Sequence, residues 1–375
     1  MAVLNTVLLA AADGLGINQP GGPWAWFILT VFGFVADYGW RVVVFTVLLK
    51  LALSPLDIFQ RVKTRKNQKI TKRLEPEIEK LKKQYPDQTQ FAQKQMALNK
   101  REGYSYLSAC LPALLTMVIF ITLLISLNSI SQYMNFKQYY ELHNVYTAEH
   151  AVVREAETAA GKTDKEANDL AVAAGQEAVK AHYAGIKEDF LWIKNIWSPD
   201  VFWQKPINDF DKWKANAGKY ATDPAKSGMF GGDIDEAQKK LNQMTADYDI
   251  VMSGLIDDES NATNGFLILP ILSLGLSVLQ QFLSQRQQKQ MGQSQPGGAM
   301  GGNTMKMMMW IMPIMIGIFS LQYTAAFAIY LVINYAITLT ITLTANLIFY
   351  LKDKNDKFKL ENEVQKYGRP DPKDL

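Results

Sequence analysis

Cysteine and histidine are nearly absent from this chain of 375 residues. The one cysteine, Cys110, excludes a disulfide within the chain, and His143, His150 and His182 lack the spacing of a metal site. We expect these histidines to be solvated residues on helix surfaces. Nucleotide-binding glycine motifs and catalytic constellations near the apolar runs are also missing, so we expect neither a cofactor nor an enzyme.

Strong net charge and strong overall hydropathy are missing too, because long apolar and long charged runs alternate along the chain. This alternation is typical of a polytopic membrane protein. Five runs approach the length of about 20 residues that a transmembrane helix needs: Trp40–Ile58, Leu107–Leu127, Phe266–Leu283, Met307–Leu321 and Ala325–Tyr350. A sixth run, Trp24–Ala36, is too short to cross a membrane and is expected to form an interfacial helix.

Charge predicts the orientation of these spans. Residues 60–106 carry 13 Lys/Arg against 5 Asp/Glu, whereas residues 131–262 carry 14 against 22. Because short basic loops stay in the cytoplasm, we expect a multi-pass protein of a cell membrane with its N-terminus outside and its C-terminus inside. The fold class is then all-α, with a five-span helical core, a cytoplasmic helical hairpin and a long extracytoplasmic insertion.

The predicted domains follow from these runs and charges. They are an extracytoplasmic and interfacial segment (1–38), the first span (39–59), a basic cytoplasmic hairpin (60–106), the second span (107–130), a largely helical extracytoplasmic insertion (131–263), the third span (264–284), a flexible cytoplasmic linker (285–305), the fourth span (306–322), the fifth span (324–350) and a cytoplasmic tail (351–375).

The hairpin is predicted to contain two helices. An apolar stripe marks the first helix, and Pro76 either kinks that helix or begins it. Asp87 and Gln90 suggest a capping box for the second helix, and Gly103 ends it. The basic side chains fit contact with a ribosome, a nascent chain or anionic lipid, and equally a solvated loop with no further role; DNA is not an expected partner. These side chains include Lys72, Arg73, Lys80, Lys82, Lys83, Lys100 and Arg101.

Lys50 lies in the middle of the first span. A charge at that depth costs a few kcal/mol or more unless it faces water, protein or a counter-charge. We expect no intramembrane carboxylate to pair with Lys50, so the counter-charge would come from water, a lipid phosphate or an acidic substrate residue. The alternative is a lysine that only extends to the membrane surface.

Polar side chains recur at helical spacing in the other spans. They indicate either hydrogen bonds that hold a helix bundle together or the lining of a polar groove around Lys50. The candidate groove residues beside Lys50 are Thr116, Ser273, Ser277, Gln280, Gln281, Asn334 and Thr338.

The order of motifs resembles the YidC family of membrane protein insertases. The similar motifs include Lys50 before Pro55-Leu56, Cys110-Leu111-Pro112, Phe190-Leu191-Trp192-Ile193, Leu269-Pro270 and Met312-Pro313. The resemblance implies a groove that accepts the polar part of a nascent membrane protein without nucleotide hydrolysis, with the ribosome and the Sec translocon as further partners. The family usually has Arg at the position of Lys50. A lysine ammonium acts as a point charge, whereas an arginine guanidinium can form two parallel hydrogen bonds with one carboxylate.

Other functions fit part of the pattern. A small-molecule or ion transporter would also use Lys50 at the membrane midplane, although the unequal spans argue against the internal repeats that transporters often show. A scaffold without transport activity would leave an intramembrane lysine unexplained. The sequence does not identify the substrates or the role of residues 131–263.

Overall fold

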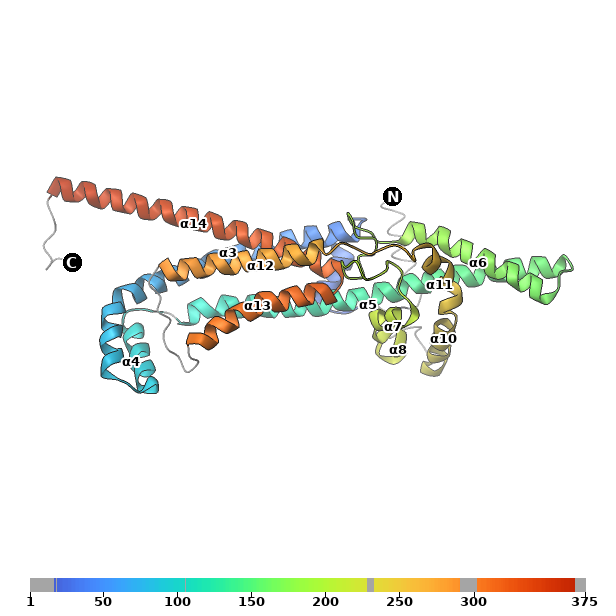
Figure 1. The fold of residues 1–375 in the computed structure, drawn as a ribbon, viewed down its shortest axis with the longest axis horizontal. Helices are drawn as coiled ribbons and strands as arrows, with labels where there is room; N and C mark the ends of the chain where they lie inside the picture. Colours follow the sequence, from blue (N-terminus) through green and yellow to red (C-terminus); the bar gives the residue numbers. More distant parts are fainter. Residues whose placement is uncertain (1–16, 18, 105, 228–232, 291–301, 368–375) are drawn as a thin grey trace. The chain divides into compact units, whose positions relative to one another are not determined.

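A computed structural model describes residues 17, 19–104, 106–227, 233–290 and 302–367 (Figure 1). This described part is helical almost throughout, and its only β-type pairing is one isolated bridge between Phe190 and Ile193. The all-α fold class is therefore confirmed. The central part of the predicted linker 285–305, residues 291–301, lies outside the described residues.

Four helices of the described part are long and apolar enough to cross a membrane, and the chain is a polytopic membrane protein. These helices are α3 (Tyr38–Gln84), α5 (Tyr106–Ala159), α12 (Ile268–Gln290) and α14 (Ala325–Tyr367). The fifth predicted span coincides with the start of α14. The fourth predicted span lies in α13 (Gly302–Gln322), where the stretch Pro313–Gln322 is a shorter apolar helix.

The long helices run past the predicted span ends without interruption. α3 has 47 residues, so it is about 70 Å long at a rise of 1.5 Å per residue, and the apolar core of a bilayer is only about 30 Å thick. Pro55 and Pro76 both lie inside α3. Pro76 therefore does not begin the first hairpin helix, because that helix is the continuation of the first span.

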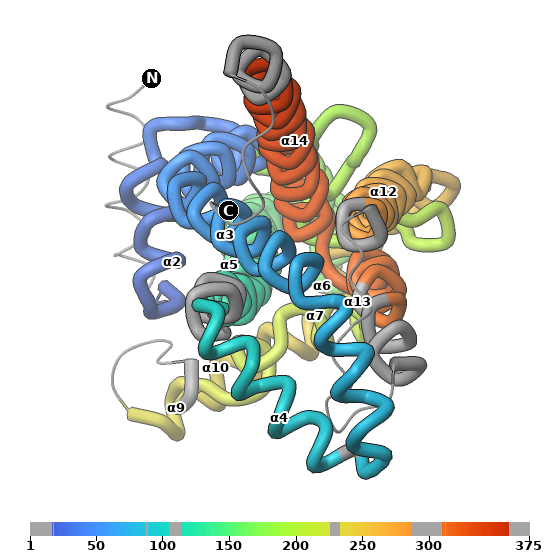
Figure 2. Tube along the Cα trace, turned by 90° about the vertical axis from the view of Figure 1, so that its left-hand side faces the viewer, coloured from blue at the N-terminus to red at the C-terminus, as the bar shows by residue number. Residues whose placement is uncertain are grey.

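The helix α4 (Gln88–Arg101) is the second arm of the hairpin and turns back from the end of α3 (Figure 2). The Asp87 carboxylate accepts the Thr89 N–H at 2.8 Å, which is a simple N-cap and not the capping box suggested by Gln90. Gly103 has a φ of 79°, a conformation that glycine adopts without strain, and it ends the helix as predicted.

The chain divides into two compact units. Each unit gathers residues from several long helices. The first contains Met1–Thr46, Met117–Gly275 and Ile314–Val332, and the second contains Val47–Thr116, Leu276–Pro313 and Ile333–Leu375.

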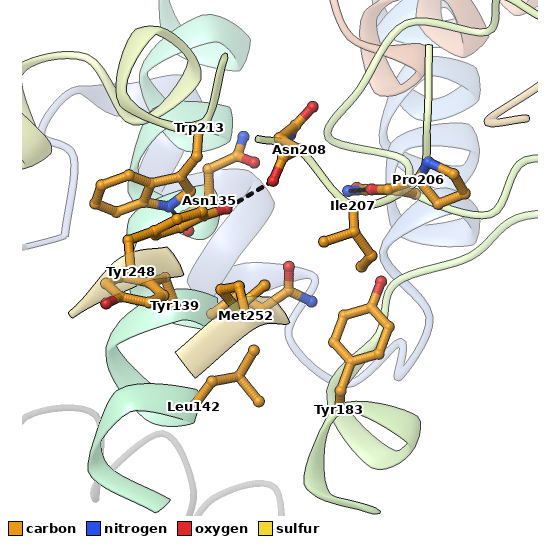
Figure 3. A pocket seen from close by; sticks show the side chains of 12 residues that line it. Asn135, Tyr139, Leu142, Tyr183, Pro206, Ile207, Asn208, Trp213, Tyr248 and Met252 are labelled. Atoms are coloured by element: carbon orange, nitrogen blue, oxygen red, sulfur yellow. Dashed lines mark hydrogen bonds between the residues drawn. The ribbon is translucent and has the colours of Figure 1, made fainter. Parts of the chain in front are cut away.

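The first unit holds the predicted insertion, which has a core rich in aromatic side chains. Tyr139 and Trp213 pack edge to face with ring centroids 4.7 Å apart, and Trp213 stacks on Tyr248 at 4.8 Å. The Tyr248 hydroxyl donates to the Asn208 carbonyl at 2.9 Å, beside a small cavity (Figure 3). The helices here are α6 (Asp164–Ile186), α7 (Phe210–Ala217), α8 (Lys219–Thr222), α9 (Pro224–Ser227), α10 (Ile234–Ala246) and α11 (Tyr248–Asp258).

Two expectations for the first unit need correction. His143 is not a solvated surface residue: it is only 8% exposed, and its Nε2 lies 3.1 Å from an Asp247 carboxylate oxygen, so the core accepts it as part of a polar pair. The N-terminal interfacial run is helical over only part of its length. It forms α2 (Pro23–Trp26) and the π-helical turn η2 (Phe27–Val31).

Candidate functional site

Lys50 lies on α3 within the second unit, and its side chain is 13% exposed. Its ammonium nitrogen is 3.9 Å from a carboxylate oxygen of Asp57, whose side chain is also 13% exposed. The expectation that Lys50 has no counter-charge within the chain is therefore wrong. Seven residues are close to two helical turns, so Asp57 projects from nearly the same side of the helix as Lys50.

The polar face of α3 continues one turn beyond Asp57. The Arg61 guanidinium donates to the Thr342 hydroxyl of α14 at 2.7 Å. The Gln280 amide of α12 donates to the same hydroxyl at 3.1 Å. Thr342 is fully buried and thus joins three helices of the second unit. The sequence pattern identified Gln280 but not the role of Arg61.

A second cluster of charges follows near the hairpin. The Arg65 guanidinium pairs with the Asp353 carboxylate and lies 4.2 Å from the centroid of the Phe349 ring. Lys69 also approaches Asp353, at 3.5 Å. The polar face of α3 therefore extends from Lys50 to Lys69, a length of about 28 Å along the helix axis.

Several buried polar atoms of the second unit make no hydrogen bond within the described chain. They include Asp57 Oδ2, Arg61 Nε and Arg65 Nε on this face of α3, and Gln285 Nε2 of α12. Buried polar atoms are hydrogen-bonded in the great majority of cases in folded proteins, and an unmet one destabilises the structure by about 1–3 kcal/mol. These atoms are three donors and one acceptor whose hydrogen-bonding capacity is not used among the described residues.

One predicted groove residue, Ser273, belongs to the first unit. Its hydroxyl donates to the Pro270 carbonyl within α12 and lies 3.1 Å from the Ser320 hydroxyl of α13. The contact with Ser320 joins two helices, as in the alternative interpretation of the polar stripes.

The other predicted groove residues belong to the second unit. Thr338 donates to the Asn334 carbonyl one turn earlier, and Thr342 lies one turn later on the same face of α14. Ser277 is buried, whereas Thr116 and Gln281 are half-buried. Gln280, through Thr342, joins the face that holds Arg61. The ion pair of Lys50 is with Asp57, which the sequence pattern did not mark as a groove residue.

The predicted hairpin residues are all exposed. Arg73 pairs with Glu102 at 2.7 Å, and Arg101 approaches Glu77 at 3.9 Å, so these contacts link the two arms of the hairpin. Exposed ion pairs contribute little to stability, roughly 0–1 kcal/mol each. The lysines at positions 72, 80, 82, 83 and 100 remain on the surface as a basic patch.

A second polar network lies in the first unit, at the start of α12. Asp200 is fully buried, and its carboxylate accepts the backbone N–H groups of Phe266 at 2.8 Å and Leu269 at 2.7 Å. It also accepts the indole N–H of Trp192 at 3.3 Å. A Cβ atom at Gly265 would overlap this carboxylate. Asp200 is therefore the cap of a membrane span, since a carboxylate at a helix N-terminus meets free N–H groups and a favourable dipole.

The same loop also holds the starts of α14 and α3. The Ala325 N–H donates to the Ser198 carbonyl at 2.9 Å, and the Ala326 N–H donates to the Ile196 carbonyl at 3.2 Å. On α3, the Tyr38 ring lies 4.4 Å from Trp197. Residues 188–200 thus connect the N-terminal ends of three long helices, and we call this segment the hub loop.

Glu188 is the first residue of the hub loop. Its carboxylate accepts the Tyr38 N–H at 3.3 Å. Burial raises the pKa of Glu188 to about 7, although the Tyr38 hydrogen bond and the charge of Arg41 act in the opposite direction. The sequence pattern did not identify Glu188 or Asp200, because carboxylates in an irregular loop have no periodicity to mark them.

The comparisons with known proteins agree with this architecture. Residues 30–352 match the family model described as 60Kd inner membrane protein. This match covers all five predicted spans, the hairpin and the hub loop. The chain belongs to the YidC family. The resemblance noted in the sequence is thereby confirmed.

Curated relatives carry the name membrane protein insertase YidC. The protein of Laribacter hongkongensis is 34% identical over 124 residues, which cover 33% of this chain and 22% of that protein. That of Thiobacillus denitrificans is 32% identical over 125 residues, or 31% and 22% of the two chains. That of Stenotrophomonas maltophilia strain K279a is 37% identical over 99 residues, or 26% and 17%. The matches thus span about a fifth of these YidC proteins.

Proposed function

We propose that this protein is a membrane protein insertase of a bacterial cell membrane. The observation that carries this proposal is the charged face of α3, where Lys50, Asp57 and Arg61 lie within or beside a membrane span. Buried polar atoms of Asp57 and Arg61 make no hydrogen bond to any described residue. Membership of the YidC family and the names of the relatives support it.

The proposed mechanism lowers the cost of moving polar groups across the bilayer. An unmet polar group costs several kcal/mol in hydrocarbon, and the face of α3 would supply replacement donors and charge. Lys50 would attract acidic residues in the translocated tail of the substrate. The apolar segment of the substrate would then move into lipid, driven by about 25 cal/mol for each Å² of apolar surface removed from water. No nucleotide would be hydrolysed.

The orientation belongs to this proposal. The excess of basic residues in the hairpin supports a cytoplasmic position for it and for the C-terminus, with the N-terminus outside. The exposed basic patch would then receive the nascent chain and contact the ribosome or anionic lipid. The Sec translocon would be a further partner. The hub loop would hold the outer ends of three helices together while the inner face admits substrate.

The decisive experiment measures insertion into liposomes that contain the purified protein. The substrate is a small single-span protein with an acidic N-terminal tail, and the readout is the fraction protected from added protease. We expect insertion above that of empty liposomes, and a loss of about tenfold for Lys50→Ala, since close charge pairs contribute about 1.5 kcal/mol or more to binding. Lys239→Ala, which removes an exposed lysine of α10, is the matched control and should behave as wild type.

Other outcomes would contradict the proposal. If well-folded wild-type protein inserts no substrate of several tested, autonomous insertion is wrong and the transporter interpretation of Lys50 gains weight. If Lys50→Ala and Lys239→Ala insert equally well, insertion does not use the charged face of α3.

A further inference from the structure

Asp57 lies between two cations on the same face of α3. Lys50 is seven residues before it and Arg61 is four residues after it, so the three side chains project from neighbouring positions on the helix surface. The structure pairs Asp57 with Lys50 at 3.9 Å. The site therefore carries one net positive charge when all three groups are ionised, and Asp57 screens both cations.

The contact of Asp57 with Lys50 is loose. A charge-assisted hydrogen bond is about 2.7–2.9 Å long, and 3.9 Å is outside that range. Asp57 Oδ2 is buried and accepts no hydrogen bond within the described residues. A carboxylate that approached Lys50 at hydrogen-bonding distance would thus interact with it more strongly than Asp57 does.

Arg61 is a second cation with which the Asp57 carboxylate can pair. Its Nη2 is engaged with Thr342, but its Nε is buried and donates no hydrogen bond among the described residues. Residues four apart on a helix can pair, as Asp and Arg commonly do. When another acid occupies Lys50, Asp57 can therefore turn to Arg61 Nε, and no charge is left without a partner.

We propose that Asp57 is an internal counter-ion that sets the charge preference of the insertase. An acidic residue of the substrate displaces Asp57 from Lys50 and Asp57 moves to Arg61; the exchange reverses when the substrate leaves. Asp57 therefore weakens the binding of acidic substrate tails to Lys50, so that these tails can be released. It also reduces the repulsion between Lys50 and basic tails. This inference rests on the insertase function proposed above.

The test compares wild type with Asp57→Asn, using the full chain in liposomes. Three versions of one single-span substrate carry two Asp, two Asn or two Lys residues in the tail, together with a photo-crosslinking group. The readout is the yield of crosslink to the protein. We expect the ratio of Asp-tail to Asn-tail yield to rise roughly fivefold in Asp57→Asn, because a competing close charge has been removed. The Lys-tail yield should fall.

Two further variants separate this effect from damage to the helix. Asp57→Glu keeps the charge and should keep the wild-type ratio. The double variant Lys50→Gln with Asp57→Asn removes both charges of the pair and should lower the ratio to about that of Lys50→Gln alone. The three Asp57 variants should unfold at denaturant concentrations similar to that of wild type.

Two results would overturn the inference. If the Asp-to-Asn ratio is unchanged or falls in Asp57→Asn while wild type crosslinks and inserts substrates, Asp57 does not compete for Lys50. If Asp57→Asn still raises the ratio when Lys50 is Gln, the effect does not pass through Lys50. A wild-type protein that inserts no substrate contradicts the proposed function itself and is recognised by the absence of protease protection in every arm.

Discussion

Two acidic residues, Asp200 in the first unit and Asp57 in the second, differ in how the chain satisfies them. Asp200 is fully buried and accepts three hydrogen bonds of 2.7–3.3 Å. Asp57 is nearly as buried, but its contact is one ammonium at 3.9 Å and its Oδ2 accepts no hydrogen bond in the described part. A buried carboxylate whose hydrogen bonds are all formed holds its neighbours in place, whereas one with unused hydrogen-bonding capacity can exchange partners. The hub loop is therefore suited to fixing helix ends, and the charged face of α3 to exchanging ion partners.

The largest effect is expected when Asp200 is replaced. Asp200→Ala leaves three donors without an acceptor and should lower the free energy of unfolding by about 3–5 kcal/mol. Asp57→Asn removes no hydrogen bond among the described residues and only a loose ion contact of 3.9 Å, so it should cost less than Asp200→Ala. Denaturant titration in detergent, followed by tryptophan fluorescence, checks both losses. Equal losses would mean that Asp57 is structural as well.

A smaller effect should appear in the pH dependence of the hub loop. The pKa of Glu188 is raised from 4.5 to about 7 in the folded chain. The folded state thus binds the proton more tightly, so the contribution of Glu188 to stability is complete below about pH 4.5 and is lost as the pH rises through 7. Above pH 7, Glu188→Gln should be more stable than wild type by about 1–3 kcal/mol, and at pH 4.5 the two should be nearly equal.

The control for this titration is Asp169→Asn, which removes an exposed carboxylate of α6. Its difference from wild type should not follow the same course between pH 4.5 and 8. A Glu188→Gln curve parallel to that of wild type would show that the hub loop tolerates an ionised Glu188, and would weaken the contrast between the two regions.

The smallest expected effect concerns the Thr342 hydroxyl, which joins α3, α12 and α14. Thr342→Val keeps the shape of the side chain but removes the acceptor of Arg61 and Gln280. Hydrogen bonds between membrane helices contribute about 0.6 kcal/mol on average, so stability should fall by less than about 1 kcal/mol. Ser273→Ala in the first unit is the matched change and should cost a similar amount. If Thr342→Val alone lowered the free energy of unfolding by more than about 2 kcal/mol, the polar face of α3 would have a mainly structural role.

The fold was largely predictable because it follows from patterns repeated over many residues. Apolar runs of span length and the balance of basic and acidic residues marked the long helices and the hairpin. Helix ends were less predictable. The chain between the first span and the hairpin is polar, and polarity ends a membrane span without ending a helix, so the boundary at residue 59 has no counterpart in α3.

The candidate site was predictable only in part. Lys50 stands out because a charge is rare in the middle of an apolar run, whereas its partner Asp57 lies near the polar end of the predicted first span, where charges are common. Asp200 and Glu188 owe their roles to the folding of an irregular loop against helix ends distant in sequence. Contacts of that kind leave no periodic signal, and only coordinates reveal them.

The unbroken course of α3 gives the protein a fixed internal ruler. Measured along the axis of α3, which bends before the hairpin (Figure 1), Lys72 of the basic patch lies about 33 Å from Lys50. An extended peptide of about ten residues has the same length. Under the proposed function, a polar substrate tail of that size would reach both positions at once, and a much shorter tail would reach only one of them. Insertion should then depend on the number of residues in the tail as well as on its charge.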